Sequence, residues 1–396
     1  MKLNYNSTIK ACFIGYIVQS IVNNFLPLLF VTLQKQFQIP LSEITILITF
    51  NFLLQLAVDF AAAFFVDKIG YRAAAILAHT FSAIGLILLS VLPSAMNNHL
   101  LGVIISVVFY AIGGGLLEVI ISPIVESCPS EHKEKTMSML HSFYCWGTAG
   151  VILVSTFAFN LFGIENWAAL AAMWAIVPIV NGIFFLKVPI NEICSAEEGI
   201  SIKSLVKTKM FWIFVLIMCC SGASEQAISQ WASTFTEKAL GISKTVSDLV
   251  GPTLFSIMMG TSRAIYGKFG DRINLSKMML LSTLCCTAAY VIIVFSSSAL
   301  VGLIGIAISG FSVGILWPGS FSRSVKVIKG GGSAMFAFLA LAGDVGCAAG
   351  PTFAGKIAAL ADDNLKIGVL AAIVFPIVLL FLLLYTNSKD STLPNK

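Results

Sequence analysis

Charged residues are scarce in this chain. Only 11% of its 396 residues are Asp, Glu, Lys or Arg, whereas 58% are hydrophobic and the mean hydropathy is +0.93. A soluble globular domain carries about 25% charged residues, so this composition excludes a water-exposed surface of this size. We therefore expect a chain that uses the lipid bilayer as its solvent.

Motifs for catalysis, metal binding and nucleotide binding are scarce as well. The sequence has no HExxH, no CxxC pair and no Walker loop, so we expect no enzyme, ATP-driven pump, cofactor or metal site. The nine cysteines include Cys219–Cys220 and Cys285–Cys286 inside apolar runs, and we interpret them as small buried hydrophobes. The net charge of +5 comes from short loops and does not indicate a nucleic-acid partner.

Twelve apolar runs are each long enough to cross a bilayer, which takes about 20 helical residues. They cover 10–33, 45–66, 73–93, 99–126, 137–162, 165–187, 209–236, 248–270, 277–296, 299–322, 333–356 and 364–386. Lysines and arginines in the termini, between the runs and at the ends of the runs number 18 on the side of both termini and 5 on the other. The positive-inside rule therefore predicts a multi-pass cell-membrane protein with both termini in the cytoplasm.

The two halves of the chain repeat each other. Lys68-Ile69-Gly70-Tyr71-Arg72 follows the second run and Lys268-Phe269-Gly270-Asp271-Arg272 follows the eighth, while Ser122-Pro123 in the fourth run corresponds to Trp317-Pro318 in the tenth. Parallel duplication of this kind is typical of rocking-bundle transporters. We predict an all-α membrane protein with twelve transmembrane helices in two pseudo-symmetric six-helix bundles, over 1–187 and 209–396, joined by a cytoplasmic linker over 188–208.

The repeated loops are predicted to act as gating loops. Gly70 and Gly270 permit tight turns, and Arg72 and Arg272 can anchor helix ends at anionic headgroups, while Asp67 can cap or pair across its turn. Anchoring of the topology alone is the alternative interpretation.

Ionisable side chains inside predicted spans are functional candidates, because burying charge in a bilayer is costly. The spans contain four acids and one base, so at least one acid is expected to be protonated or neutralised by a cation. We predict proton coupling at Glu118, Asp344 and Glu225. Asp59 lies on a stripe with Asn51 and Gln55 that we interpret as a seam between domains, and Arg263 is expected to snorkel to the surface.

Polar and aromatic side chains cluster on several of these spans. Gly114, Glu118 and Ser122 share one helix face by their spacing of four, and Gly113–Gly115 is expected to leave the cavity wall open near Glu118. Amides, carboxylates and aromatic rings together suit the recognition of hydroxyl groups. The predicted substrate-binding residues are Asn23, Asn24, Glu118, His141, Glu225, Gln226, Gln230, Trp231 and Trp317.

The frame Asp67-x-x-Gly70-x-Arg72, echoed after the eighth span, resembles the signature loop of the major facilitator superfamily. The resemblance covers the whole chain. It implies the major facilitator fold, in which helices 1, 4, 7 and 10 line a central cavity, and would place Glu118 and Glu225 at that cavity.

A narrower resemblance lies in helices 4 and 5. Gly113-Gly114-Gly115-Leu116-Leu117-Glu118, followed by Ser122-Pro123, is similar to the helix-4 motif of the fucose permease family of sugar–proton symporters, and His141-Ser142-Phe143-Tyr144-Cys145-Trp146-Gly147 is similar to its helix-5 motif. The resemblance implies that Glu118 is the proton-responsive acid and that His141, usually a glutamine in the family, contacts sugar. The family's helix-1 aspartate after an Asn pair is absent, because Asn23-Asn24 leads to Pro27.

We therefore predict a monomeric secondary transporter that imports a neutral sugar or similar polar solute with protons, sodium being the less favoured ion. An anionic substrate is disfavoured, because no Lys or Arg is expected in the middle of the cavity. The alternatives are a proton-coupled exporter of drugs or metabolites, whose usual Gly-Pro-rich helix-5 motif is missing, and a non-transporting sensor or enzyme.

Overall fold

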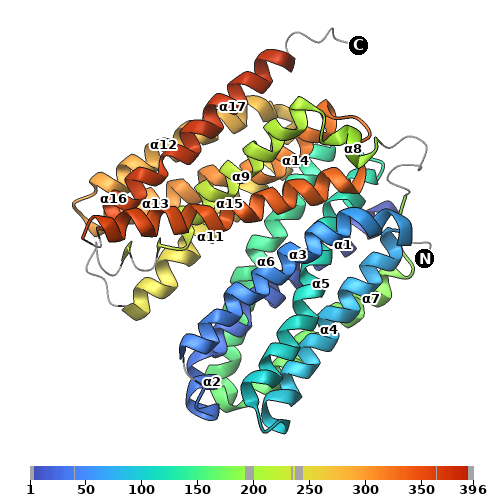
Figure 1. The fold of residues 1–396 in the computed structure, drawn as a ribbon, viewed down its shortest axis with the longest axis vertical. Coiled ribbons are helices and arrows are strands. Elements are labelled where there is room, and N and C mark those ends of the chain that lie inside the picture. Colours follow the sequence, from blue (N-terminus) through green and yellow to red (C-terminus); the bar gives the residue numbers. More distant parts are fainter. Residues whose placement is uncertain are drawn as a thin grey trace. The chain divides into compact units, whose positions relative to one another are not determined.

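The computed structural model describes residues 4–39, 41–191, 200–232, 235–236, 244–362 and 364–390. Residues 192–199 of the predicted linker lie outside this part. All regular secondary structure in the described residues is helical (Figure 1), which confirms the predicted all-α class.

Each of the first six predicted spans corresponds to helical structure. The first is divided into α1 (Tyr5–Asn24), the 3-10 helix η1 (Leu26–Leu29) and α2 (Phe30–Phe37). Pro27 explains the division, because its ring clashes with the carbonyl of Asn23 and it has no N–H to donate. The others are α3 (Leu41–Ile69), α4 (Tyr71–Ala95), α5 (His99–Ser127), α6 (Lys133–Phe162) and α7 (Trp167–Phe185), which η2 (Ile164–Asn166) precedes.

The second half follows the same plan with two further divisions. The tenth predicted span is split into α13 (Ala299–Val313) and α14 (Leu316–Val327), and the twelfth into α16 (Leu365–Ala372) and α17 (Val374–Asp390). The remaining elements are α8 (Ile202–Leu205), α9 (Lys209–Ser229), α11 (Lys244–Phe269), η3 (Gly270–Arg272), α12 (Leu275–Phe295) and α15 (Gly332–Leu360).

Within the described residues, ten helical segments are long and apolar enough to cross a membrane. Helices α3 and α11, with 29 and 26 residues, complete the twelve predicted spans by their length. Polar residues of the short loops begin several of these helices. The side chains of Asn98, Asn274 and Ser298 accept hydrogen bonds from backbone N–H groups in the first turns of α5, α12 and α13.

The chain forms two compact units. The first comprises Met1–Glu131, Phe143–Gly199 and Gly332–Ala337, and the second comprises His132–Ser142, Ile200–Gly331 and Phe338–Lys396. Helix α6 therefore contributes its first turns to the second unit and the rest to the first. These units differ from the predicted bundles in the segments 132–142 and 332–337, and the bundle boundaries stay a prediction.

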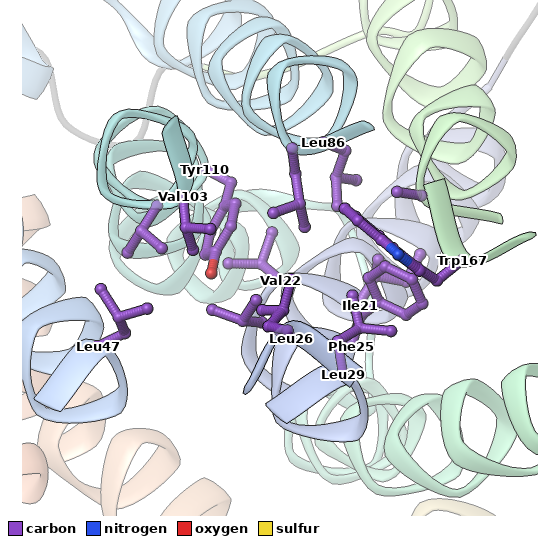
Figure 2. Close-up of a cluster of buried hydrophobic side chains, with 14 of the residues drawn as sticks. Ile21, Val22, Phe25, Leu26, Leu29, Leu47, Leu86, Val103, Tyr110 and Trp167 are labelled. Carbon is purple, nitrogen blue, oxygen red and sulfur yellow. The ribbon is translucent and has the colours of Figure 1, made fainter. Parts of the chain in front are cut away.

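A hydrophobic core holds the first unit together (Figure 2). Ile21, Val22 and Phe25 of the α1–η1 segment are at most 2% exposed and pack with Tyr110 of α5 and Trp167 of α7. The Trp167 indole N–H donates to the Gln36 side chain over 2.9 Å, which satisfies the one polar atom of that ring. The core fixes α1 against α4, α5 and α7, and so positions the polar residues that α1 carries.

The glycine run of α5 is a place of close helix packing, so the expectation of an open wall at Gly113–Gly115 is wrong. A Cβ on Gly113 would lie 2.6 Å from the Ala78 carbonyl oxygen of α4, and one on Gly115 would lie 3.0 Å from the Gln55 carbonyl oxygen of α3. Small residues permit such backbone approach between membrane helices. The run brings α3 and α4 onto α5.

Replacing Gly113 with Ala should separate α4 from α5 and lower the thermal unfolding midpoint of the purified protein in detergent. Gly150→Ala is the matched control, because a Cβ on Gly150 has no neighbour within 4 Å and no positive φ opposes it. The control should be neutral or gain up to ~1 kcal/mol of helix propensity. Equal unfolding midpoints for the two variants would contradict the packing role.

Candidate functional site

Polar contacts join α1 to one face of α5. Gln19 Nε2 donates to Glu118 Oε2 over 2.6 Å, and the Tyr16 hydroxyl lies 3.0 Å from Ser122 Oγ. A Cβ on Gly114 would lie 3.0 Å from Val22 of α1. Gly114, Glu118 and Ser122 therefore all face α1, which confirms the shared face that their spacing of four predicts.

Asn23 lies at the centre of a group of amides at the end of α1. Its Oδ1 accepts from Gln55 Nε2 over 2.8 Å and from Asn51 Nδ2 over 3.3 Å, and its Nδ2 donates to the Tyr144 hydroxyl over 3.4 Å. Asn51 and Gln55 bind Asn23 within the first unit, and the domain seam interpreted from their stripe stays a prediction. Their stripe on α3 was visible in the sequence, but the partner of the stripe was not.

Asn24 extends this group toward α6. Its Nδ2 donates to the Ser20 carbonyl over 2.9 Å and to Thr148 Oγ1 over 3.2 Å. We refer to the side chains of Gln19, Asn23, Asn24, Asn51, Gln55, Glu118 and Tyr144 as the first-unit polar cluster. Asn23, Asn24 and Glu118 are each only partly buried, whereas Gln19, Asn51 and Gln55 are buried.

Asp59 of α3 lies close to this cluster. It is fully buried, and carboxylate oxygens of Asp59 and Glu118 lie within 4.8 Å of each other. Two ionised carboxylates at this separation repel each other strongly in a poorly solvated place. Spacing along α3 places Asp59 only on a stripe with Asn51 and Gln55, whereas its neighbour Glu118 lies on another helix.

In the second unit, the acid of α9 pairs with a buried base. Arg263 Nη2 lies 3.4 Å from Glu225 Oε2, and the two side chains are 4% and 12% exposed. Arg263 Nη1 also donates to the His141 carbonyl over 3.2 Å. The expectation that Arg263 snorkels to the surface is therefore wrong, because its guanidinium has acceptors inside the protein.

One of those acceptors exists because a helix is broken. Arg263 Nε donates to the Gly314 carbonyl oxygen over 2.8 Å. Gly314 lies between α13 and α14, four residues before Pro318, and a proline cannot donate to the carbonyl four residues earlier. Arg263 supplies the missing donor. In the sequence, Pro318 therefore predicts that the Gly314 carbonyl lacks its helical hydrogen-bond donor.

The remaining substrate candidates of α9 extend from Glu225. Gln226 Nε2 donates to Glu225 Oε1 over 3.3 Å, and Gln230 Nε2 donates to Gln226 Oε1 over 3.2 Å. Gln230 is exposed, at the point where α9 ends. The three side chains form a chain of hydrogen bonds that reaches from the buried Arg263 to an accessible amide.

The predicted aromatic residues are used in helix packing. Trp231 donates from its indole to the Pro351 carbonyl over 3.0 Å, and Trp317 is 9% exposed and packs against Gly343. The buried ring of His141 stacks on Phe321, with centroids 5.9 Å apart. A stacking role toward substrate for these rings stays a prediction.

Asp344 lies half-buried on α15, next to Gly343 in the sequence. Cβ atoms on Gly343 and Gly346 would meet the Trp317 ring at 2.3 Å and the Cys219 carbonyl oxygen at 1.9 Å. The small residues beside Asp344 therefore allow close packing of α15 against α9 and α14, as small residues do at membrane helix interfaces. A coupling role for Asp344 stays a prediction.

The first of the two repeated loops turns at Gly70, whose φ of +81° favours glycine. Arg72 Nη1 donates to the carbonyls of Phe185 and Leu186 at the end of α7, over 2.7 and 2.9 Å. A basic group at these carbonyls complements the negative end of the helix dipole. Asp67 accepts a hydrogen bond from the Tyr71 hydroxyl over 3.3 Å.

The second loop differs from the first in its chemistry. Gly270 has no positive φ, and a Cβ there would lie 2.6 Å from the Lys135 side chain. Lys135 donates to Asp271 over 2.5 Å, and His132 Nδ1 lies 3.0 Å from the same carboxylate. The hydrogen bond from Lys135, aided by the charge of nearby basic groups, holds the pKa of Asp271 below its usual value. Glycine is used here for close approach, whereas at Gly70 it permits a turn.

Gly310–Gly314 matches the pattern GxSxG of serine hydrolases, but its setting is unsuitable for catalysis. In those enzymes the serine lies on a sharp turn between a strand and a helix. Here Ser312 lies in α13 and donates to the Ile308 carbonyl over 2.6 Å. The pentapeptide is part of a membrane helix.

Removing the Glu225 charge should destabilise the protein, because it takes away the carboxylate that pairs with the buried Arg263 cation. We expect Glu225→Gln to cost about 3–5 kcal/mol, the usual magnitude for a broken buried pair. The double variant Glu225→Gln/Arg263→Gln should recover part of this loss. Thermal unfolding in detergent measures both, and a double variant no more stable than Glu225→Gln would argue against a coupled pair.

Comparison with known proteins agrees with this architecture. Residues 12–351 match the family model described as Major Facilitator Superfamily. No curated protein matches the sequence at a significant level. The fold is similar to that of the E. coli fucose:proton symporter FucP, with a TM-score of 0.79, 16% identity and coverage of 96% of this chain and 97% of that one.

Two other solved structures show the same fold. The proton:xylose symporter XylE has a TM-score of 0.80 at 11% identity, over 96% of this chain and 95% of its own. The human organic anion transporter MFSD10 has a TM-score of 0.74 at 15% identity, over 96% and 99%. Because the family model spans most of the chain and the fold agrees with it, the protein belongs to the Major Facilitator Superfamily, a family of membrane transporters rather than enzymes.

Proposed function

We propose that the protein is a monomeric secondary transporter of the cell membrane that carries a neutral sugar or similar polar solute together with protons. Both termini lie in the cytoplasm in this proposal. The observation that carries it is the position of Glu118, whose carboxylate accepts from Gln19 over 2.6 Å within the first-unit polar cluster. FucP and XylE, which share the fold, are a fucose:proton and a xylose:proton symporter.

The first-unit polar cluster has the chemistry that hydroxyl groups require. Each Asn or Gln offers both a donor N–H₂ and an acceptor oxygen, and a sugar hydroxyl can use either. Asn23 and Asn24 lie where α1 ends before Pro27, so part of the local backbone is also outside regular helix. In this proposal a polyhydroxylated solute exchanges its water for these amides.

Proton loading in this proposal takes place on Glu118, with Asp59 as its neighbour. The two carboxyls lie within 4.8 Å of each other, so a proton shared between them removes a repulsion between like charges. A neutralised cluster is also easier to enclose in a poorly solvated place. Protonation then favours closure around substrate, which is the rule that a symporter needs.

The second unit contributes a buried ion pair and the amides that extend from it. This unit does contain a buried base, Arg263, but Glu225 compensates its charge, so an anionic substrate stays disfavoured. We propose that Gln226 and the exposed Gln230 contact substrate, that Glu225 and Asp344 adjust their protonation during the cycle, and that the Asp67–Arg72 and Gly270–Arg272 loops gate access.

Export of an organic ion is the second candidate function. The Arg263–Glu225 pair favours it, because a charged substrate can displace one partner and bind the other. The human transporter MFSD10, of the same fold, is an organic anion transporter.

Counterflow separates these two functions. Proteoliposomes preloaded with an unlabelled panel of hexoses, pentoses and polyols should accumulate the matching radiolabelled solute transiently. Asn23→Ala should weaken the interaction by about 1–3 kcal/mol, measured as a higher half-saturation concentration, because it leaves buried amide partners unpaired. Counterflow with organic anions and with no neutral solute would instead support the exporter.

Glu118→Gln should retain counterflow but lose uphill uptake driven by a pH gradient. The glutamine side chain has the same size as glutamate and its oxygen can still accept a hydrogen bond, but it cannot bind and release a proton. Glu165→Gln, at an exposed carboxylate in η2, is the matched control and should accumulate substrate like the wild type. Gradients of pH and sodium are imposed separately in both variants. Accumulation by Glu118→Gln at the wild-type level would refute the assignment of Glu118, and uptake that follows only sodium would replace the proton as the coupling ion.

A further inference from the structure

A groove runs between α1 and α7 within the first unit. Its volume is about 540 Å³, within the range of roughly 300–1,000 Å³ typical of ligand pockets. Ile14 of α1 forms one wall, and Ile176, Val180, Ile183 and Phe184 of α7 form the other, with Lys187 at one end. None of its lining residues is among the substrate-binding or proton-coupling residues proposed above.

The groove is built for hydrocarbon. Ile176, Val180 and Ile183 are 55%, 59% and 52% exposed although they belong to a membrane-spanning helix. Exposed apolar side chains at that depth contact lipid, because water is excluded from the bilayer core. If the groove were empty, the side chains that line it would lack van der Waals contacts on one side. An extended acyl chain has the shape and polarity to fill it.

The end of the groove is basic. Lys187 is exposed and has no ion-pair partner among the residues that the structure describes. Lys10 is also exposed and precedes Ile14 by four residues on α1, so it lies at the same end and on a neighbouring part of the same face. The positive-inside rule predicts that this end faces the cytoplasm, where anionic lipids attract basic residues next to membrane helices.

Arg72 makes this end still more suitable for an anion. Its guanidinium donates to the carbonyls of Phe185 and Leu186, which would otherwise present negative partial charge beside Lys187. The last turn of α7 is therefore already neutralised from within the protein. Lys187 remains available for a group from outside.

We propose that this groove is a binding site for one anionic phospholipid. The acyl chain lies along Ile14, Val180 and Ile183, and the phosphate group binds Lys187 and Lys10. The apolar wall selects a lipid over a soluble phosphate, and the two lysines select an anionic headgroup over a zwitterionic one. The site is separate from the transport function proposed above.

Native mass spectrometry of the purified full-length protein tests this proposal. The protein is mixed with equal amounts of dioleoyl phosphatidylglycerol and dioleoyl phosphatidylethanolamine, and the bound adducts are counted. Wild type should prefer the glycerol lipid by about fivefold per lysine engaged. Lys187→Gln should reduce the preference by about that factor, and Val180→Trp should reduce the binding of both lipids by filling the groove.

Two matched variants serve as controls. Lys277→Gln removes an exposed lysine at the start of α12, and Val91→Trp adds the same bulk to a 53% exposed position of α4 outside the groove. Both should bind lipid like the wild type, and size-exclusion profiles confirm folding. A preference unchanged by Lys187→Gln, equal binding by the two Trp variants, or displacement of the lipid by soluble glycerol 3-phosphate would each overturn the proposal.

Discussion

The hydrogen bond from Arg263 Nε to the Gly314 carbonyl, 2.8 Å long, meets the constraint on which this structure depends. Inside a bilayer no water can satisfy a backbone carbonyl, so any break in a helix needs a donor from the protein itself. The chain breaks its tenth span between α13 and α14 and uses a buried guanidinium to do so. That cation requires an acid, and Glu225 on α9 supplies it. The irregular backbone, the buried base and the buried acid therefore depend on one another.

The two halves use similar sequence patterns for different chemistry. The proline after Ser122 lies inside a continuous α5, whereas the proline after Trp317 follows a break. Glu118 is held by a neutral amide, and Glu225 by a cation. Under the proposed function, Glu118 exchanges its proton beside a neutral amide, whereas any proton exchange at Glu225 takes place beside the buried Arg263 cation.

The sequence predicted the features that repeat or that follow one helix. Twelve spans, the duplicated loops and the face of Gly114, Glu118 and Ser122 all depend on local length and spacing, and all twelve spans correspond to helical structure. Contacts between distant helices could not be predicted in this way. In the sequence, Arg263 lies only a few residues before the loop that follows the eighth span, and this position predicted that its side chain would snorkel to the surface. The acceptor that holds it, Gly314, is 51 residues away. Likewise, nothing in the sequence around Gln55 predicts that its side chain binds Asn23 of another helix.

The glycines of α5 show how packing and polar chemistry are linked. A Cβ on Gly114 would lie 3.1 Å from Gln55 Oε1, the other end of the amide whose nitrogen donates to Asn23 over 2.8 Å. The glycine therefore does not leave a space for substrate; it leaves room for an amide of α3 that reaches α1. Close packing at Gly114 joins α5 to α1 and α3, and the hydrogen bond at Glu118, four residues later on the same face, joins α5 to α1 again. The absence of a side chain at Gly114 therefore allows the Gln55 amide to reach Asn23.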